Sequence, residues 1–346
     1  SLVNQLNGRF DILPLTRHFL TNQALVTNET RQLVQERWLN YLLTLTEENQ
    51  YFNRQSYANL SPEIENIKGA IKWCWENRHR MLIDFVNNIA YFLHGSGYWN
   101  HLEKYLKWGI ETAVFFEEEV PQARFYYLLG NINQYWGKLD IAETHVQRAI
   151  SISEATGQTH RLALSLNRLG LIERRKKRYA EAESLFQESI AIAKELQSNG
   201  LMIRNHLGLS IVAIDEGDYA RAASFQEKCF ELDEKTNWQA AWWYRQRGQV
   251  AAFNQEYEKA QWLLQRSLDI AAALPMQQNI AEALYCQAYL ALATGDYELA
   301  RSKVNQAQEL FGKLSMYPQI PETEGLIQVI EEAATTQTRP AFKGYL

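Results

Sequence analysis

The sequence predicts an all-α protein, a right-handed superhelical solenoid of stacked helix–turn–helix repeats. Three observations predict this fold. Related residues recur at a nearly constant spacing along most of the chain, Pro and Gly are scarce (7 and 17 of 346 residues), and hydrophobic residues make up 46% of the sequence. Scarce Pro and Gly favour long helices over a turn-rich β fold, and stacked repeats need ample apolar surface to bury.

The repeat is clearest in four segments that align without gaps, each with a Tyr three residues before an Ala. These pairs are Tyr179/Ala182, Tyr219/Ala222, Tyr257/Ala260 and Tyr297/Ala300, preceded by the weaker copies Leu139/Ala142 and Trp99/Leu102. The lead positions 99, 139, 179, 219, 257 and 297 are separated by 40, 40, 40, 38 and 40 residues. A period this constant indicates a repeat architecture.

Small residues mark a second position of each unit, nine residues before the lead residue. They are Ala90, Gly130, Gly170, Ser210, Gly248 and Ala288. We interpret each unit as helix A, a short turn and helix B, with the small residue and the Ala allowing the two helices to pack closely. Turns such as 216–218 and 294–296 offer a Gly for positive φ and an Asp for helix capping.

These features resemble the tetratricopeptide repeat, with its small residue on helix A and its Tyr–x–x–Ala opening helix B. The resemblance covers roughly residues 82–316, which we assign as about six repeats within 81–316, the first degenerate. The period of 40 exceeds the family's commoner value of about 34, and the Pro that usually closes each repeat is largely missing. Residues 317–346 are predicted to form a capping helix and a tail whose polar start favours a free end.

The first 27 residues are predicted to end another structure. The strand-like segments LVNQL and RFDIL flank Asn7-Gly8, a hairpin signal, and Pro14 opens an apparent helix. This order resembles the last wing of a winged-helix domain, so we expect the chain to be a piece of something longer. Two helices follow, at about 29–54 and 61–78, within a helical linker over 28–80.

A motif in the second linker helix resembles signal-transduction ATPases with numerous domains (the STAND class, of NB-ARC type). Its residues are Glu65, Asn66, Ile67, Ala70, Ile71 and Trp73. By resemblance, an upstream nucleotide-binding switch domain precedes the array, and the array senses a trigger. This chain has no phosphate-binding loop of its own, because Gly137-Lys138 and Gly312-Lys313 lack the earlier Gly and the following hydroxyl residue.

Composition and motifs argue against several function classes. The net charge is −5 with no basic arm, so nucleic acid is an unexpected partner. No apolar run reaches the roughly 18 residues of a membrane span. Three separated cysteines fit a reducing cytoplasm, and the seven histidines show no metal-ligand spacing. We therefore expect a cytoplasmic, non-catalytic protein with no metal and no cofactor.

The concave wall of the solenoid, lined by the A helices, is the predicted binding surface for a protein or peptide. Helical register places these residues on it: Arg124, Tyr127, Asn131, Asn167, Arg174, Arg175, Arg204, Trp242, Arg245, Gln249, Tyr285 and Tyr289. Asn and Gln suit a peptide backbone, Arg suits a carboxylate, and aromatic rings add rigid apolar area. Trp242 is expected in this groove, whereas Trp243 or Tyr244 fills the core.

Four of the arginines, Arg174, Arg175, Arg204 and Arg245, are predicted to form a positive patch that suits an acidic or C-terminal peptide segment. Alternatively, the run 174–178 (RRKKR) is a solvated helix end. Two other functions stay open: a free-standing adaptor that bridges proteins, and a sensor of an oligosaccharide stacked on Trp242 and Tyr289.

Overall fold

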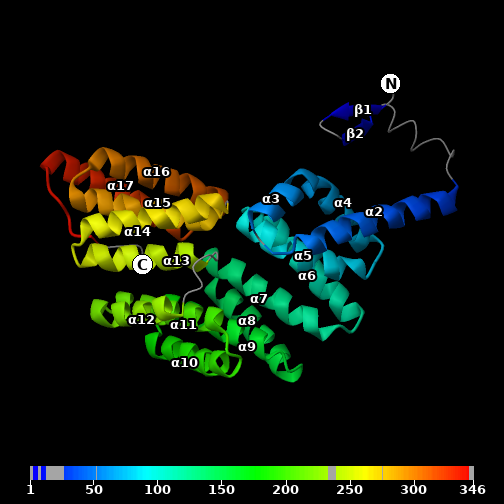
Figure 1. Cartoon of the computed structure of the whole chain (residues 1–346), viewed down its shortest axis with the longest axis horizontal. Coiled ribbons are helices and arrows are strands. Elements are labelled where there is room, and N and C mark those ends of the chain that lie inside the picture. Colours follow the sequence, from blue (N-terminus) through cyan, green and yellow to red (C-terminus); the bar gives the residue numbers. More distant parts are fainter. Residues whose placement is uncertain are drawn as a thin grey trace. The chain divides into compact units, whose positions relative to one another are not determined.

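A computed structural model describes residues 3–6, 9–12, 27–51, 53–232, 239–274 and 276–342 (Figure 1). The chain divides into two compact units, Ser1–Glu48 and Asn49–Leu346. Each is described by itself below. The predicted boundaries at 27, 80 and 316 stay predictions.

The first unit contains the predicted β-hairpin. Strands β1 (Val3–Leu6) and β2 (Arg9–Ile12) pair antiparallel, with Val3 opposite Ile12 and Leu6 opposite Arg9. The Asn7-Gly8 turn and the helix predicted from Pro14 lie outside the described residues. Helix α2 (Asn28–Glu48) completes the unit. The interpretation as a winged-helix remnant stays a prediction.

The second unit begins with short helices, and here the predicted single helix over 29–54 was wrong. Helix α2 ends at Glu48, and a new helix, α3 (Arg54–Leu60), starts because Asn53 caps it. The Asn53 side chain accepts a hydrogen bond from the Ser56 backbone N–H at 2.9 Å, and the Ser56 hydroxyl accepts one from the Asn53 N–H at 3.1 Å. This reciprocal capping box starts a helix without any apolar period. The 3₁₀ turn η1 (Ser61–Glu63) and helix α4 (Ile64–Glu76) follow.

Six helix pairs then form the solenoid, as predicted. They are α5 (Met81–Gly95) with α6 (Trp99–Phe115), α7 (Glu119–Tyr135) with α8 (Leu139–Ala155), α9 (Thr159–Arg175) with α10 (Tyr179–Glu195), α11 (Asn199–Asp215) with α12 (Tyr219–Glu231), α13 (Gln239–Phe253) with α14 (Tyr257–Ala273), and α15 (Gln277–Thr294) with α16 (Tyr297–Lys313). Every predicted lead residue is the first residue of a B helix. Each helix packs mainly against the ones before and after it, so the colours in Figure 1 pass in order through this unit.

The small residues on the A helices stand where neighbouring side chains leave no room. A Cβ on Gly130 would lie 2.3 Å from a methyl group of Val146, and one on Gly248 would lie 2.8 Å from Leu264. The ring of Phe186 lies against both Gly170 and Gly208, within 2.7 and 2.6 Å of a Cβ at those positions. The close helix approach that the sequence predicted is therefore confirmed.

The turns between A and B helices use the predicted chemistry. Gly217 and Gly295 have φ values of 78° and 85°, in the left-handed region that Gly adopts without strain. Asp218 accepts a hydrogen bond from the backbone N–H of Arg221, and Asp296 accepts one from Leu299. These caps satisfy N–H groups at the start of each B helix.

The first two repeats contact the C-terminal end of the array. The indole N–H of Trp136 donates to the carbonyl oxygen of Leu314 at 3.2 Å, although the two residues are 178 positions apart. A Cβ on Gly97 would lie 2.9 Å from the Leu314 side chain, and one on Gly137 would lie 2.5 Å from Pro318. The turns after α5 and α7 thus contact the turn that joins α16 to α17 (Gln319–Thr336).

The segment after α17 docks on the array, so the expectation of a free tail was wrong as far as Phe342. The Phe342 ring is buried against Phe253 and Tyr289, and the Tyr297 hydroxyl donates to the Thr338 carbonyl at 2.7 Å. Burial of the Phe342 ring stabilises the docked segment more than the polar residues before it favour a free tail. Residues 343–346 lie outside the described part.

Over the part of the chain that the structure describes, no helix is long and apolar enough to cross a membrane. The described residues also contain no cluster of three or more His, Cys, Asp or Glu that could hold a metal ion. Cys74, Cys229 and Cys286 are buried as free thiols, and burial raises the pKa of Cys74 to about 12.

Candidate functional site

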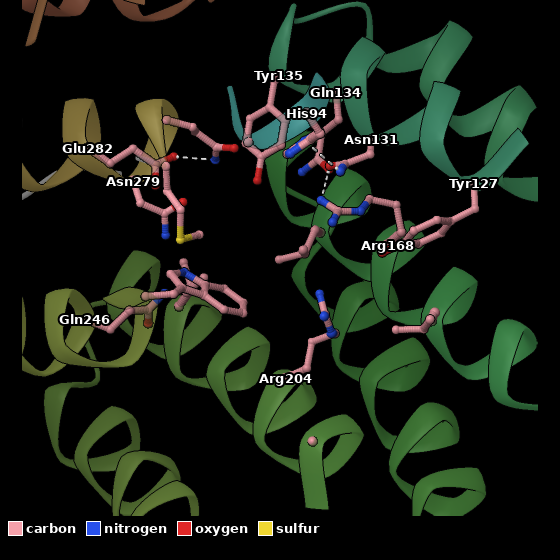
Figure 2. Close-up of a pocket in the computed structure, with 18 of the residues that line it drawn as sticks. His94, Tyr127, Asn131, Gln134, Tyr135, Arg168, Arg204, Gln246, Asn279 and Glu282 are labelled. Atoms are coloured by element: carbon pink, nitrogen blue, oxygen red, sulfur yellow. Dashed lines mark hydrogen bonds between the residues drawn. The ribbon is translucent and has the colours of Figure 1, made fainter. Parts of the chain in front are cut away.

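A cavity of about 490 Å³ lies inside the repeat array. Its wall comes mainly from the A helices α5, α7, α9, α11, α13 and α15, as the sequence predicted for the inner surface. The volume falls within the range of small-ligand sites, roughly 300–1,000 Å³. Figure 2 shows Arg168 and Arg204 pointing into it from one side, with Asn279 and Glu282 on the other.

Most of the predicted site residues meet at this cavity. The eight that line it are Tyr127, Asn131, Arg174, Arg175, Arg204, Trp242, Arg245 and Gln249. Their convergence from four helices places amide, guanidinium and aromatic groups around one space. That they bind a ligand stays a prediction.

Four predicted residues do not line the cavity. Arg124 does not line the cavity itself. Its guanidinium carbon lies 5.0 Å from the ring centre of Tyr91, and Tyr91 lines the cavity. Asn167 packs between α9 and α11, where its amide donates to Asn205 at 2.8 Å. Tyr285 and Tyr289 contact each other, with ring centres 5.2 Å apart, and serve helix packing.

Asn167 and Tyr285 share one repeat position, which lines the cavity in some repeats and faces helix packing in others. Both stand twelve residues before their lead residue, a position that lines the cavity at Tyr127 and Arg245. Among the described repeats, the position eleven residues before the lead residue lines the cavity at Leu128, Arg168 and Gln246. Adjacent helix positions point about 100° apart, so Asn167 turns into the packing and Arg168 turns inward.

Arg168 is a buried charged group of the wall that the sequence did not predict. Its side chain is 5% exposed and donates to the Gln134 side-chain oxygen at 2.9 Å. Its guanidinium carbon lies 5.8 Å from the ring centre of Tyr127 and 6.0 Å from that of Tyr135. No described residue accepts a hydrogen bond from its Nε.

The predicted patch of Arg174, Arg175, Arg204 and Arg245 requires correction, because two of its members carry their own counter-charge. Arg174 donates to both carboxylate oxygens of Asp215, at 2.5 and 2.9 Å. Arg245 pairs with Glu282 at 2.8 Å, with both side chains 6% exposed. Burial favours such pairing, since an isolated charge in the interior is costly.

The basic run 174–178 divides into two faces, so neither reading of it holds for the whole run. Arg174 and Arg175 line the cavity. Lys176 pairs with Asp140 and Glu143 on α8, away from it.

His94 is buried and belongs to the wall. Its Nε2 lies 3.1 Å from the amide nitrogen of Asn131, which donates, so Nε2 accepts and the ring is neutral. Burial, reinforced by the positive charge of Arg168, lowers the pKa of His94 to about 4. The spacing of the seven histidines predicted no metal site and gave no signal that His94 lines the cavity.

The pKa of Tyr127 indicates strong positive charge around its phenol. Burial by itself raises the pKa of this phenol, but the charges of Arg168 and Arg204 outweigh burial and bring the pKa down to about 8. The inner wall therefore stabilises negative charge at this place.

The tryptophan pair on α13 follows its prediction. Trp242 lines the cavity, while Trp243 is buried in a cluster with Ile203, Leu207 and Cys229.

A family model for the tetratricopeptide repeat matches residues 121–195 and, in a second register, 161–235. Residues 121–235 thus match this repeat, and the helix pairs as a whole form a tetratricopeptide-like solenoid. No curated protein matches the chain.

Solved structures share this tetratricopeptide-like fold at low sequence identity. A Rap protein complexed with Competence and Sporulation Factor is 11% identical, with a TM-score of 0.59, covering 94% of this chain and 92% of its own. NprR in complex with its cognate peptide NprX is 14% identical, with a TM-score of 0.58, covering 91% and 92%. Aspartyl phosphate phosphatase F from Bacillus subtilis is 12% identical, with a TM-score of 0.51, covering 92% and 86%.

Proposed function

We propose that the tetratricopeptide array binds a short peptide inside the cavity of about 490 Å³. The observation that carries this proposal is a pair of buried amide oxygens on the wall. The side-chain oxygens of Asn131 and Gln246 accept no hydrogen bond from any described residue. A buried acceptor without a partner is costly, and a peptide backbone offers N–H donors along its whole length.

The rest of the wall suits the same ligand. Tyr127, Tyr135 and Trp242 supply rigid apolar area for side chains. Gln249 and Asn279 add amide groups that donate and accept together. NprR, a protein of similar fold over nine-tenths of this chain, was solved in complex with its cognate peptide NprX. This likeness supports a peptide as the occupant.

The proposal extends to a sensor role within a larger signalling ATPase of the STAND class. The order of hairpin, α4 motif and repeat array supports it. Ile67, Ala70 and Ile71 of the motif are buried in packing, whereas Glu65 is exposed and pairs with Lys68. Helix packing by itself therefore explains three of the six residues of the motif. A natural gene without a phosphate-binding loop upstream of Ser1 would rule out this context and favour the adaptor alternative.

The oligosaccharide alternative loses its geometric basis. It required Trp242 and Tyr289 to face one ligand. Trp242 lines the cavity, but Tyr289 packs against Phe342 of the C-terminal segment. The two rings therefore serve different structures.

The experiment that tests peptide binding is capture from the peptide fraction of the source cells. The immobilised protein is washed and denatured, and retained peptides are identified by mass spectrometry. A Leu164→Trp variant fills the cavity wall, while Leu299→Trp makes the same change on an exposed site of α16. We expect wild type and Leu299→Trp to retain the same peptides and Leu164→Trp to lose them, with all three folded. Equal retention by Leu164→Trp would exclude the cavity as the site.

A further inference from the structure

Three arginines near Tyr127 have no acidic partner among the described residues, unlike Arg174 and Arg245. Arg124, Arg161 and Arg168 form no ion pair with any described residue. Arg161 lies 5.3 Å over the Tyr127 ring, and Arg168 lies 5.8 Å from the same ring centre. Several guanidinium groups thus surround one phenol without a carboxylate.

The charge of this cluster reaches the cavity through Arg168 and Arg204. Both line the cavity, from α9 and α11, and Figure 2 shows their guanidinium groups directed into the same space. Arg168 is 95% buried, and its Nε is without an acceptor among the described residues. A buried, incompletely bonded guanidinium aimed into a cavity is a ready donor for an oxyanion.

The pKa values of two neighbouring histidines are lowered, the direction in which nearby positive charge acts. Burial and the charge of Arg168 lower the pKa of His94. Burial together with Arg161 and Arg204 lowers the pKa of His160, which also lines the cavity. The arginine charges thus disfavour a further cation here and favour an anion, while both histidines stay neutral.

We propose that Arg168 and Arg204 form a seat for a carboxylate of the bound peptide. This inference rests on the proposed function and specifies its ligand: the peptide carries a free C-terminal carboxylate or an Asp or Glu side chain at the position facing α9 and α11. The forked guanidinium groups donate to the carboxylate oxygens, while the amides of Asn131 and Gln246 on neighbouring helices contact the backbone.

Three pools of synthetic pentapeptides test the proposal against immobilised wild-type protein. The first has free C-termini and omits Asp and Glu, the second has amidated C-termini and includes them, and the third is amidated and omits them. We expect about tenfold or more retention from a carboxylate-bearing pool over the third pool, because a hydrogen bond between charged groups contributes at least that factor. The first two pools distinguish a terminal carboxylate from a side chain.

The outcomes separate this inference from the proposed function. Retention of the third pool as strongly as the others overturns the carboxylate seat and leaves peptide binding intact. Retention of no pool overturns both.

Single substitutions test whether the preference for carboxylate-bearing peptides comes from Arg168 and Arg204. Arg168→Gln should bring the ratio between pools to about one, and Arg148→Gln, the same change on the exposed face of α8, should leave it unchanged. Because Arg168 is buried and bonded to Gln134, the Arg204→Gln variant provides a second test that does not depend on the folding of the first. Thermal unfolding checks each variant. An unchanged ratio in a folded Arg168→Gln or Arg204→Gln variant would overturn the assignment.

Discussion

Trp136 and Leu314, 178 residues apart, are joined by a hydrogen bond of 3.2 Å from the indole N–H to the carbonyl oxygen. The contact brings the turn after α7 against the turn before α17, so the second repeat and the C-terminal end of the array support each other. Most other contacts in a solenoid are between sequence neighbours. This long-range contact therefore couples repeats that would otherwise unfold independently.

Replacing Trp136 by Phe should weaken that coupling. The ring retains apolar area but donates no hydrogen bond, which leaves a buried carbonyl unsatisfied and costs about 1–3 kcal/mol of unfolding free energy. Denaturant unfolding measures the loss, and hydrogen exchange should show faster opening at 314–318. Trp262→Phe, on a 61% exposed residue, should change neither. Equal effects of the two substitutions would show that the Trp136 contact adds no stability.

The repeat packing can be tested at Gly170. An added Cβ would meet the Phe186 ring at 2.7 Å, so Gly170→Ala should destabilise the fold by about 1–3 kcal/mol through overpacking. Gly325, inside α17, has no atom within 4 Å of an added Cβ, and Gly325→Ala should stabilise by up to about 1 kcal/mol through helix propensity. Opposite signs in thermal unfolding are the expected result; destabilisation at both sites would mean that Gly serves a purpose other than close packing.

Acid should destabilise the protein partly through His94. Its folded pKa of about 4 lies below the usual 6.5, so between these values the unfolded chain binds a proton that the folded chain does not. Stability is therefore lost as pH falls from about 6.5 towards 4, by about 2 kcal/mol between pH 7 and 5 from this residue. A His94→Gln variant should lose correspondingly less stability over that interval in urea titrations. Identical pH slopes would show that His94 is not held neutral.

Ligand binding should weaken at alkaline pH because of Tyr127. Its pKa of about 8 means that the phenolate forms above that pH and competes with a ligand carboxylate for Arg168 and Arg204. For any peptide captured from the pools, affinity should fall by about tenfold between pH 7 and 9. Tyr127→Phe should remove most of this fall. A drop of the same size in Tyr127→Phe would assign the titration to another group.

The fold was predictable because its signal is local and repeated. Each Tyr–x–x–Ala lead residue fixes the first turn of a B helix, and the matching Gly or Ala fixes the helix approach, so six units reinforce one assignment. The break before α3 was missed because it depends on one capping side chain, Asn53, instead of a period. Phe342 was missed because its pocket forms from residues near 253 and 289, which sequence distance hides.

The candidate site was predictable only in part. Choosing the A helices as the wall followed from the architecture, and eight of twelve residues lie there. Within α9 adjacent residues turn the side chain by about 100°, so Arg168 faces the cavity where Asn167 was predicted, although the equivalent residues Tyr127 and Arg245 do line it. The pairing of Arg174 with Asp215 joins two repeats, so the charge of the patch could not be counted from residue types alone.

The most direct test of the central claim is a crystal structure of the protein with a captured peptide. The account predicts a peptide in the cavity between α9, α11 and α13, with one carboxylate on Arg168 and Arg204 and its backbone near Asn131 and Gln246. A peptide bound on the outer faces of the B helices, with the cavity unchanged, would contradict it.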